Sequence, residues 1–161
     1  MRKNRVQFMT QAAMIAAIYV VLTIFISAFN LASGAIQVRI SEALTILPAF
    51  TPAAIPGLFI GCLISNLVTG AMLPDIIFGS LATLLGAIGS YFCRKCKWAV
   101  SVPPILSNVL IIPLILAYVY HFPGSVPYFM FTIGIGQVIS CGILGMLLYN
   151  VLNKYRNIIF K

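Results

Sequence analysis

Residues 37–61 read Gln-Val-Arg-Ile-Ser-Glu-Ala-Leu-Thr-Ile-Leu-Pro-Ala-Phe-Thr-Pro-Ala-Ala-Ile-Pro-Gly-Leu-Phe-Ile-Gly. This stretch places Arg39 and Glu42 inside an otherwise apolar sequence, and Glu42 is one of only two acidic residues in the 161-residue chain. A charge at bilayer depth costs roughly 2.5–3.5 kcal/mol on insertion scales, so a membrane protein would keep Glu42 for a purpose. The prolines and the glycine that follow interrupt regular helix, which allows a buried polar site to form.

The composition outside this stretch is that of an integral membrane protein. Hydrophobic residues make up 61% of the chain and charged residues 7%, with a mean hydropathy of +1.08. A soluble domain carries about 25% charged residues. The first apolar run is too long for a secretory signal peptide, has no Ala-x-Ala site and is followed by further apolar runs. We therefore expect a single transmembrane domain over residues 1–161, located in the plasma membrane.

The formal charge of +8 is concentrated in three short clusters. Residues 2–5, 94–97 and 154–161 hold nine of the ten basic residues, and only Arg39 lies elsewhere. Short basic clusters beside apolar runs are typical of cytoplasmic segments. The charge therefore indicates a membrane topology and no nucleic-acid partner, and we expect both termini and the central cluster on the cytoplasmic side.

The apolar runs predict about six transmembrane helices. A spanning helix needs about 20 mostly apolar residues. Five runs fit or approach this length: Met9–Phe29, Ile55–Val68, Pro74–Phe92, Pro104–Tyr120 and Val126–Leu152. A shorter run, Ile40–Phe50, either spans or forms a re-entrant hairpin with the run after it. Because the basic clusters require an even number of crossings on each side of Arg94, we favour an all-α bundle of six spans.

The first of these runs carries a stripe of small residues, Ala12-Ala13-x-x-Ala16-Ala17. Two overlapping small-x-x-x-small pairs let another helix backbone approach closely. The pattern predicts either packing within the protein or contact with a partner helix.

The charged residues are candidates for a ligand site near the external face, where six spans would also place His121. Arg39 and Glu42 are three residues apart and share one face if their segment is helical. They predict either a structural ion pair or a ligand anchor, because a carboxylate accepts two parallel N–H donors such as those of a guanine-like base. Asp75 follows Pro74 at a predicted helix start, where it either caps the helix or recognises a cationic ligand group.

Uncharged polar residues within the spans extend this set of candidates. Asn66, Asn108 and Gln137 need hydrogen-bond partners there, which either neighbouring helices or a ligand supply. Tyr128 and Phe129 either stack on a flat ligand or anchor a helix end at the membrane interface.

Several features of an enzyme are missing from the sequence. No G-x-x-x-x-G-K-[ST] loop, H-E-x-x-H or G-x-S-x-G motif occurs. The lone C-x-x-C at Cys93 and Cys96 has no second ligand pair, so we expect no metal and no cofactor. We expect a protein that is not an enzyme, and any uphill transport must draw its energy from a partner or an ion gradient.

The run from Gln37 to Asn66 closely resembles the QueT-type queuosine-precursor transporters, which are substrate-binding S components of energy-coupling factor (ECF) transporters. The resemblance implies six helices and a pocket at the outer side. It also implies partners, namely a transmembrane coupling subunit and two cytoplasmic ATPases, with the alanines of the first helix (Ala12, Ala13, Ala16 and Ala17) against the coupling subunit.

The ligand implied is a 7-deazaguanine such as queuine, preQ1 or preQ0. From their chemistry we hypothesise that Glu42 binds the guanine-like edge, that Arg39 orients Glu42, and that Asp75 meets the aminomethyl cation of preQ1. Two alternatives remain: an S component for another vitamin or nucleobase, and a stand-alone secondary transporter or channel.

Overall fold

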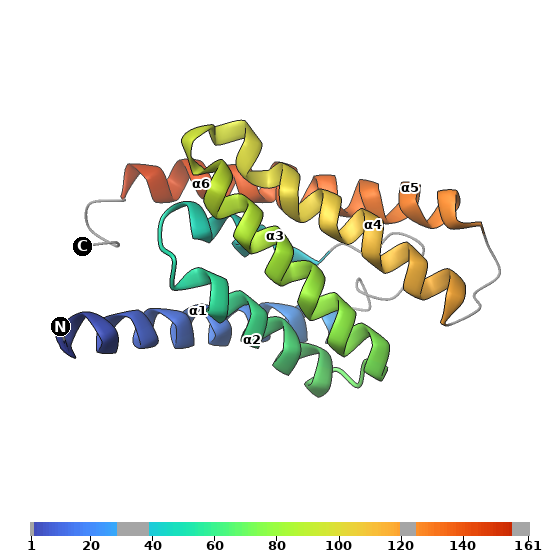
Figure 1. Cartoon of the computed structure of the whole chain (residues 1–161), viewed down its shortest axis with the longest axis horizontal. Coiled ribbons are helices and arrows are strands. Elements are labelled where there is room, and N and C mark those ends of the chain that lie inside the picture. The colour runs from blue at the N-terminus through green and yellow to red at the C-terminus, as the bar shows by residue number, and fades with distance from the viewer. Residues whose placement is uncertain (1, 29–38, 120–124, 156–161) are drawn as a thin grey trace.

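The computed structural model describes residues 2–28, 39–119 and 125–155, which form helices and no strand (Figure 1). Three of the short helices, η1, η3 and η4, are 3₁₀-helices, and two, η2 and η5, are π-helices. The elements in chain order are α1 (Arg2–Ala28), η1 (Ile40–Ala49), α2 (Ala54–Val68), η2 (Asp75–Gly79), α3 (Ser80–Phe92), η3 (Cys93–Lys95), η4 (Lys97–Ser101), α4 (Val102–Tyr118), α5 (Val126–Gln137), η5 (Val138–Leu144) and α6 (Gly145–Lys154).

Four helical stretches are long and apolar enough to cross a membrane. They are Arg5–Ala28, Asp75–Lys95, Lys97–Tyr118 and Val126–Lys154, whereas Ile40–Ala49 and Ala54–Val68 are apolar but shorter. The prediction of an all-α membrane bundle is confirmed, and the observed helices fall within a few residues of most of the expected runs. Full crossing by Ile40–Ala49 stays a prediction.

The helix η1 occupies the centre of the bundle. Its residues Ser41–Pro48 are all buried, and it packs against α1, α2, α3, α6 and η5. At about 2.0 Å per residue its ten residues extend only about 20 Å, less than the roughly 30 Å hydrocarbon core. Because protein surrounds η1 instead of lipid, an irregular and charged segment can lie at this depth.

Helices α1 and α2 pack closely through small residues. A Cβ atom at Gly61 would lie 2.9 Å from the Cβ of Tyr19 and 3.1 Å from the Cα of Ala16, and one at Gly57 would lie 2.7 Å from the carbonyl oxygen of Ala12. No side chain fits between the two helices at these glycines. This contact fixes the position of Tyr19 relative to η1.

The basic clusters lie at one end of the bundle. Figure 1 shows the beginning of α1, the η3–η4 turn and the end of α6 at the same end. The described basic residues Arg94, Lys95, Lys97 and Lys154 therefore share one end, as expected for a single membrane side. Which side of the membrane this is stays a prediction.

Candidate functional site

Glu42 lies at the centre of a buried polar cluster. Its side chain is 1% exposed, and the hydroxyl of Tyr19 on α1 donates a hydrogen bond of 2.6 Å to Oε1. The other carboxylate oxygen, Oε2, is buried and has no hydrogen-bond partner among the described residues. A buried carboxylate oxygen without a donor is costly, so this atom is available to accept a hydrogen bond from a ligand.

Thr83 of α3 and Asn108 of α4 lie next to the same carboxylate. Both interact with it through their side chains and also donate hydrogen bonds to their own helices: Thr83 Oγ1 to the carbonyl of Gly79 at 3.1 Å and Asn108 Nδ2 to the carbonyl of Pro104 at 3.1 Å. An amide nitrogen carries two hydrogens. Asn108, which is buried, therefore retains donor capacity beside Glu42.

Asn66 connects α2 to the start of η2. Its Nδ2 atom lies 3.3 Å from the backbone oxygen of Asp75 and 3.6 Å from the Sγ of Cys62. This is the helix-to-helix hydrogen bond that was one of the two expectations for Asn66. Its contact with a ligand stays a prediction.

Gln137 reaches η1 through a cysteine. Its Oε1 atom accepts a hydrogen bond of 3.2 Å from the thiol of Cys141, and that thiol lies 3.4 Å from the backbone oxygen of Glu42. Thr45 of η1 also contacts the Cys141 sulfur, at 3.6 Å. The end of α5 and the π-helix η5 are thus joined to the backbone that carries the carboxylate.

Arg39 precedes η1 in an extended conformation and interacts electrostatically with Tyr19, Glu42 and Asp75. Its side chain and that of Asp75 are half-buried. The three charged residues predicted for the site therefore belong to one electrostatic group. His121, the fourth residue expected there, lies outside the described residues.

Tyr128 is not brought into this cluster. Its side chain is 51% exposed, whereas that of Phe129 is buried, and the two rings meet edge to face with centroids 5.8 Å apart. Of the two aromatic side chains at this helix start, Phe129 is the one that faces inward. Stacking of Tyr128 on a ligand stays a prediction.

Two π-helices border the site. Asp75 begins η2, and Cys141 lies in η5 together with Ser140. Ser140 is fully buried, and its hydroxyl has no hydrogen-bond partner among the described residues. Isolated π-helical turns within α-helices are frequent at functional sites, and the unpartnered hydroxyl is a second buried group able to bond a ligand.

Sequence reasoning missed Tyr19, Thr83 and Ser140. A usable signal existed for Tyr19, because a buried tyrosine hydroxyl in an apolar helix needs a hydrogen-bond partner. Thr83 and Ser140 carried no such signal, since their hydroxyls can bond to their own helix backbone. Within the described residues, no group of three or more potential metal-ligating side chains occurs.

The alanine stripe of α1 divides into two faces. Ala12 and Ala16 contact α2 at Gly57 and Gly61, while Ala13 and Ala17 are exposed. A surface groove of about 310 Å³ runs beside Ala12, Ala13 and Ala16, between α1 and α2. Internal packing, one of the two expectations for the stripe, is found at Ala12 and Ala16. Contact of the four alanines with a partner stays a prediction.

Comparison with known proteins agrees with this architecture. The family model described as QueT transporter matches residues 9–154. A protein of Lactococcus lactis subsp. cremoris (strain MG1363), named queuosine precursor transporter QueT, is 35% identical over 85 residues, or 53% of this chain. The aligned region spans 50% of that relative's length. No solved structure matches.

The family match includes α1, η1 and every other element that contributes to the buried polar cluster around Glu42. This multi-pass membrane protein therefore belongs to the QueT transporter family.

Proposed function

We propose that this chain is the substrate-binding membrane subunit of an ECF-type importer and that it captures a queuosine precursor at the outer face of the membrane. The substrate class is a 7-deazaguanine such as preQ1, preQ0 or queuine. Family membership and the name of the Lactococcus lactis relative support this proposal. The observation that carries it is the buried Glu42 carboxylate, one oxygen of which has no donor among the described residues.

The carboxylate of Glu42 is suited to the edge of a guanine-like base. That edge presents two parallel N–H donors, and a carboxylate accepts one on each oxygen. Tyr19 holds Oε1 at 2.6 Å, which fixes the carboxylate, and Oε2 has no hydrogen-bond partner within the part of the chain that the structure describes. In this role Arg39 supplies positive charge that orients the Glu42 side chain, since the two groups interact electrostatically.

Neighbouring polar groups complete the recognition of the heterocycle. Asn108 has an amide hydrogen to donate beside Glu42, and Gln137 and Asn66 are buried in the same region of the bundle. A flat, mostly apolar pocket with a few fixed polar groups is the usual form of a small-molecule site. Asp75 meets the aminomethyl cation of preQ1, a group that preQ0 lacks.

The transport step requires partners. We propose that a transmembrane coupling subunit docks on the exposed face of α1 at Ala13 and Ala17, beside the groove of about 310 Å³. Small residues there allow close approach of a partner helix. Two cytoplasmic ATPases supply the energy, and the basic end of the bundle, with both chain termini, faces them.

Binding to the purified protein tests the proposal. Calorimetry in detergent with preQ1, preQ0, queuine and guanine should show selective binding of a 7-deazaguanine over guanine. Failure of all four to bind a folded protein would contradict the substrate class. Uptake in cells that lack the coupling subunit and ATPases would instead support a stand-alone secondary transporter.

The variant Asp75→Asn distinguishes the role proposed for Asp75, recognition of the ligand's cation, from the role proposed for Glu42. Asp75→Asn should weaken the binding of preQ1 by about tenfold, because one charge-assisted contact is lost. The affinity for neutral preQ0 should stay unchanged. Equal weakening of both ligands would show that Asp75 does not recognise the cation.

A further inference from the structure

Ser140 of the π-helix η5 carries a hydroxyl that differs from the other buried hydroxyls of this bundle. Its side chain is fully buried, and its Oγ atom has no hydrogen-bond partner among the described residues. Every other buried serine or threonine in the described part of the chain makes at least one side-chain hydrogen bond. A buried hydroxyl without a partner is costly, so this exception needs a physical explanation.

The presence of a π-helix does not explain the exception. A serine within a helix commonly donates its hydroxyl hydrogen to the carbonyl four residues earlier. Ser80 directly follows the other π-helix, η2, and its Oγ atom still donates to the carbonyl of Ile76 at 2.6 Å. Within the described ranges, Ser140 makes no such bond. Its hydroxyl is therefore available to a group that comes from outside these residues.

Ser140 lies beside the segment that carries Glu42. The thiol of the next residue, Cys141, is 3.4 Å from the backbone oxygen of Glu42. The helix η5 packs against both η1 and α4, which hold Glu42 and Asn108. The fold thus brings two buried oxygens that have no partner among the described residues, Glu42 Oε2 and Ser140 Oγ, to one junction of three helices.

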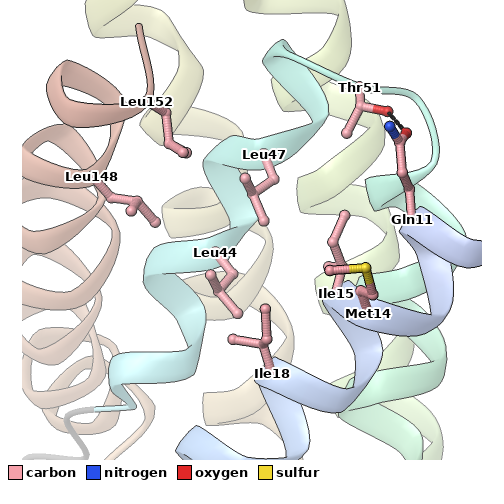
Figure 2. A pocket seen from close by; sticks show the side chains of 9 residues that line it. All are labelled: Gln11, Met14, Ile15, Ile18, Leu44, Leu47, Thr51, Leu148 and Leu152. Atoms are coloured by element: carbon pink, nitrogen blue, oxygen red, sulfur yellow. Dashed lines mark hydrogen bonds between the residues drawn. The ribbon is translucent and has the colours of Figure 1, made fainter. Parts of the chain in front are cut away.

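The faces of η1 show on which side a polar ligand finds these groups. In a 3₁₀-helix, residues three apart lie on one face. Figure 2 shows Leu44 and Leu47 pointing into an apolar groove of about 410 Å³ between α1 and α6. Glu42 and Thr45 share a different face, and Thr45 Oγ1 lies 3.6 Å from the Sγ atom of Cys141. The polar face of η1 is therefore the one that meets η5.

We propose that Ser140 donates a hydrogen bond to the ring carbonyl oxygen of the substrate and so selects a base that has this carbonyl. The inference rests on the proposed function. A guanine-like edge presents an amino group, a ring N–H and a carbonyl oxygen side by side. The carboxylate of Glu42 only accepts hydrogen bonds, so it takes the first two groups, and the carbonyl oxygen next to them needs a donor. The hydroxyl of Ser140 supplies that donor.

Two ligands separate this contact from the contact with Glu42. The first is preQ0, and the second is its 6-thio analogue, which keeps the amino group and the ring N–H but has sulfur in place of the carbonyl oxygen. Sulfur accepts hydrogen bonds more weakly than oxygen does. The ratio of the two affinities therefore measures the contact made by Ser140, whereas a general disturbance of the fold weakens both ligands.

Calorimetry in detergent with both ligands tests the proposal. Ser140→Ala should bind preQ0 about five- to tenfold more weakly, and its preference for preQ0 over the 6-thio analogue should fall by a similar factor. Ser140→Cys, which places a weak donor in a similar volume, should lower the preference in the same direction. Ser90→Ala on α3 is the matched control and should keep the preference, because its fully buried hydroxyl donates to the carbonyl of Val100 at 2.7 Å.

Thermal unfolding without ligand supplies a second readout. Ser140→Ala should unfold at the same temperature as the unmodified chain or at a higher one, because it removes a buried hydroxyl that lacks a partner, whereas Ser90→Ala should unfold at a lower temperature. A lower unfolding temperature for Ser140→Ala would overturn the proposal. An unchanged preference in Ser140→Ala would also overturn it and leave the proposed function standing. Failure of the unmodified chain to bind either ligand would contradict the proposed function and this role of Ser140 together.

Discussion

The close packing of α1 against α2 at Gly61 predicts that one added methyl group will disturb both stability and the site. In Gly61→Ala the new Cβ would lie 2.9 Å from the Cβ of Tyr19, and ordinary contact begins at 3.4 Å. The neighbouring atoms include the backbone of Ala16, which cannot rotate away, so α1 must shift by about half an ångström. Overpacking of this kind costs about 1–3 kcal/mol.

A matched control isolates this cost. Gly134→Ala on α5 would meet only Val109 Cγ2, at 3.7 Å, and it gains the same helix propensity of about 1 kcal/mol. The difference between the two variants is therefore the steric term. For a chain of this length, about 2 kcal/mol corresponds to roughly 4–8 °C in unfolding temperature.

Thermal unfolding in detergent, at one scan rate for both variants, measures this difference. We expect Gly61→Ala to unfold several degrees below Gly134→Ala and to bind ligand more weakly, because Tyr19 moves with α1 and holds Oε1 of Glu42. Equal unfolding temperatures and equal ligand affinities would refute the reasoning that the α1–α2 contact positions the site.

Further variants test the hydrogen bond to the carboxylate and the two faces of α1. Tyr19→Phe removes a charge-assisted hydrogen bond to Glu42, worth about 1.5–3 kcal/mol, so its unfolding temperature should fall; an unchanged value would show that the bond contributes nothing. Ala17→Leu, on the exposed face, should fold normally and lose co-purification with the coupling subunit. Ala16→Leu, buried against Gly61, should lose stability before any partner is present; normal stability would contradict the assigned packing.

The sequence was sufficient to predict the helical membrane bundle and most of its helices, because long apolar runs between basic clusters are compatible with few other folds. The sequence did not determine whether Ile40–Phe50 spans the membrane or forms a re-entrant hairpin. Composition cannot distinguish a short span in lipid from a segment surrounded by protein. The burial of Ser41–Pro48 depends on contacts with helices that are distant in sequence.

The site was predicted only where a residue was rare for its surroundings. Glu42 was identified because it is a carboxylate in an apolar stretch, and it is indeed buried. The direction of a side chain around a helix is harder to predict. Four alanines of α1 form one pattern in sequence, yet Ala16 faces α2 and Ala17 is exposed, a division set by where α2 packs.

The affinity of Glu42→Gln for a neutral 7-deazaguanine tests the central claim most directly. Calorimetry with preQ0 should show binding about 100-fold weaker than that of the unmodified chain, since about 3 kcal/mol is lost when an amide replaces a charged acceptor of two N–H groups. Asp75→Asn, the same change at the other acidic residue, should bind preQ0 normally. An affinity of Glu42→Gln equal to that of Asp75→Asn would contradict the account, because the buried carboxylate would then not be the anchor of the ligand.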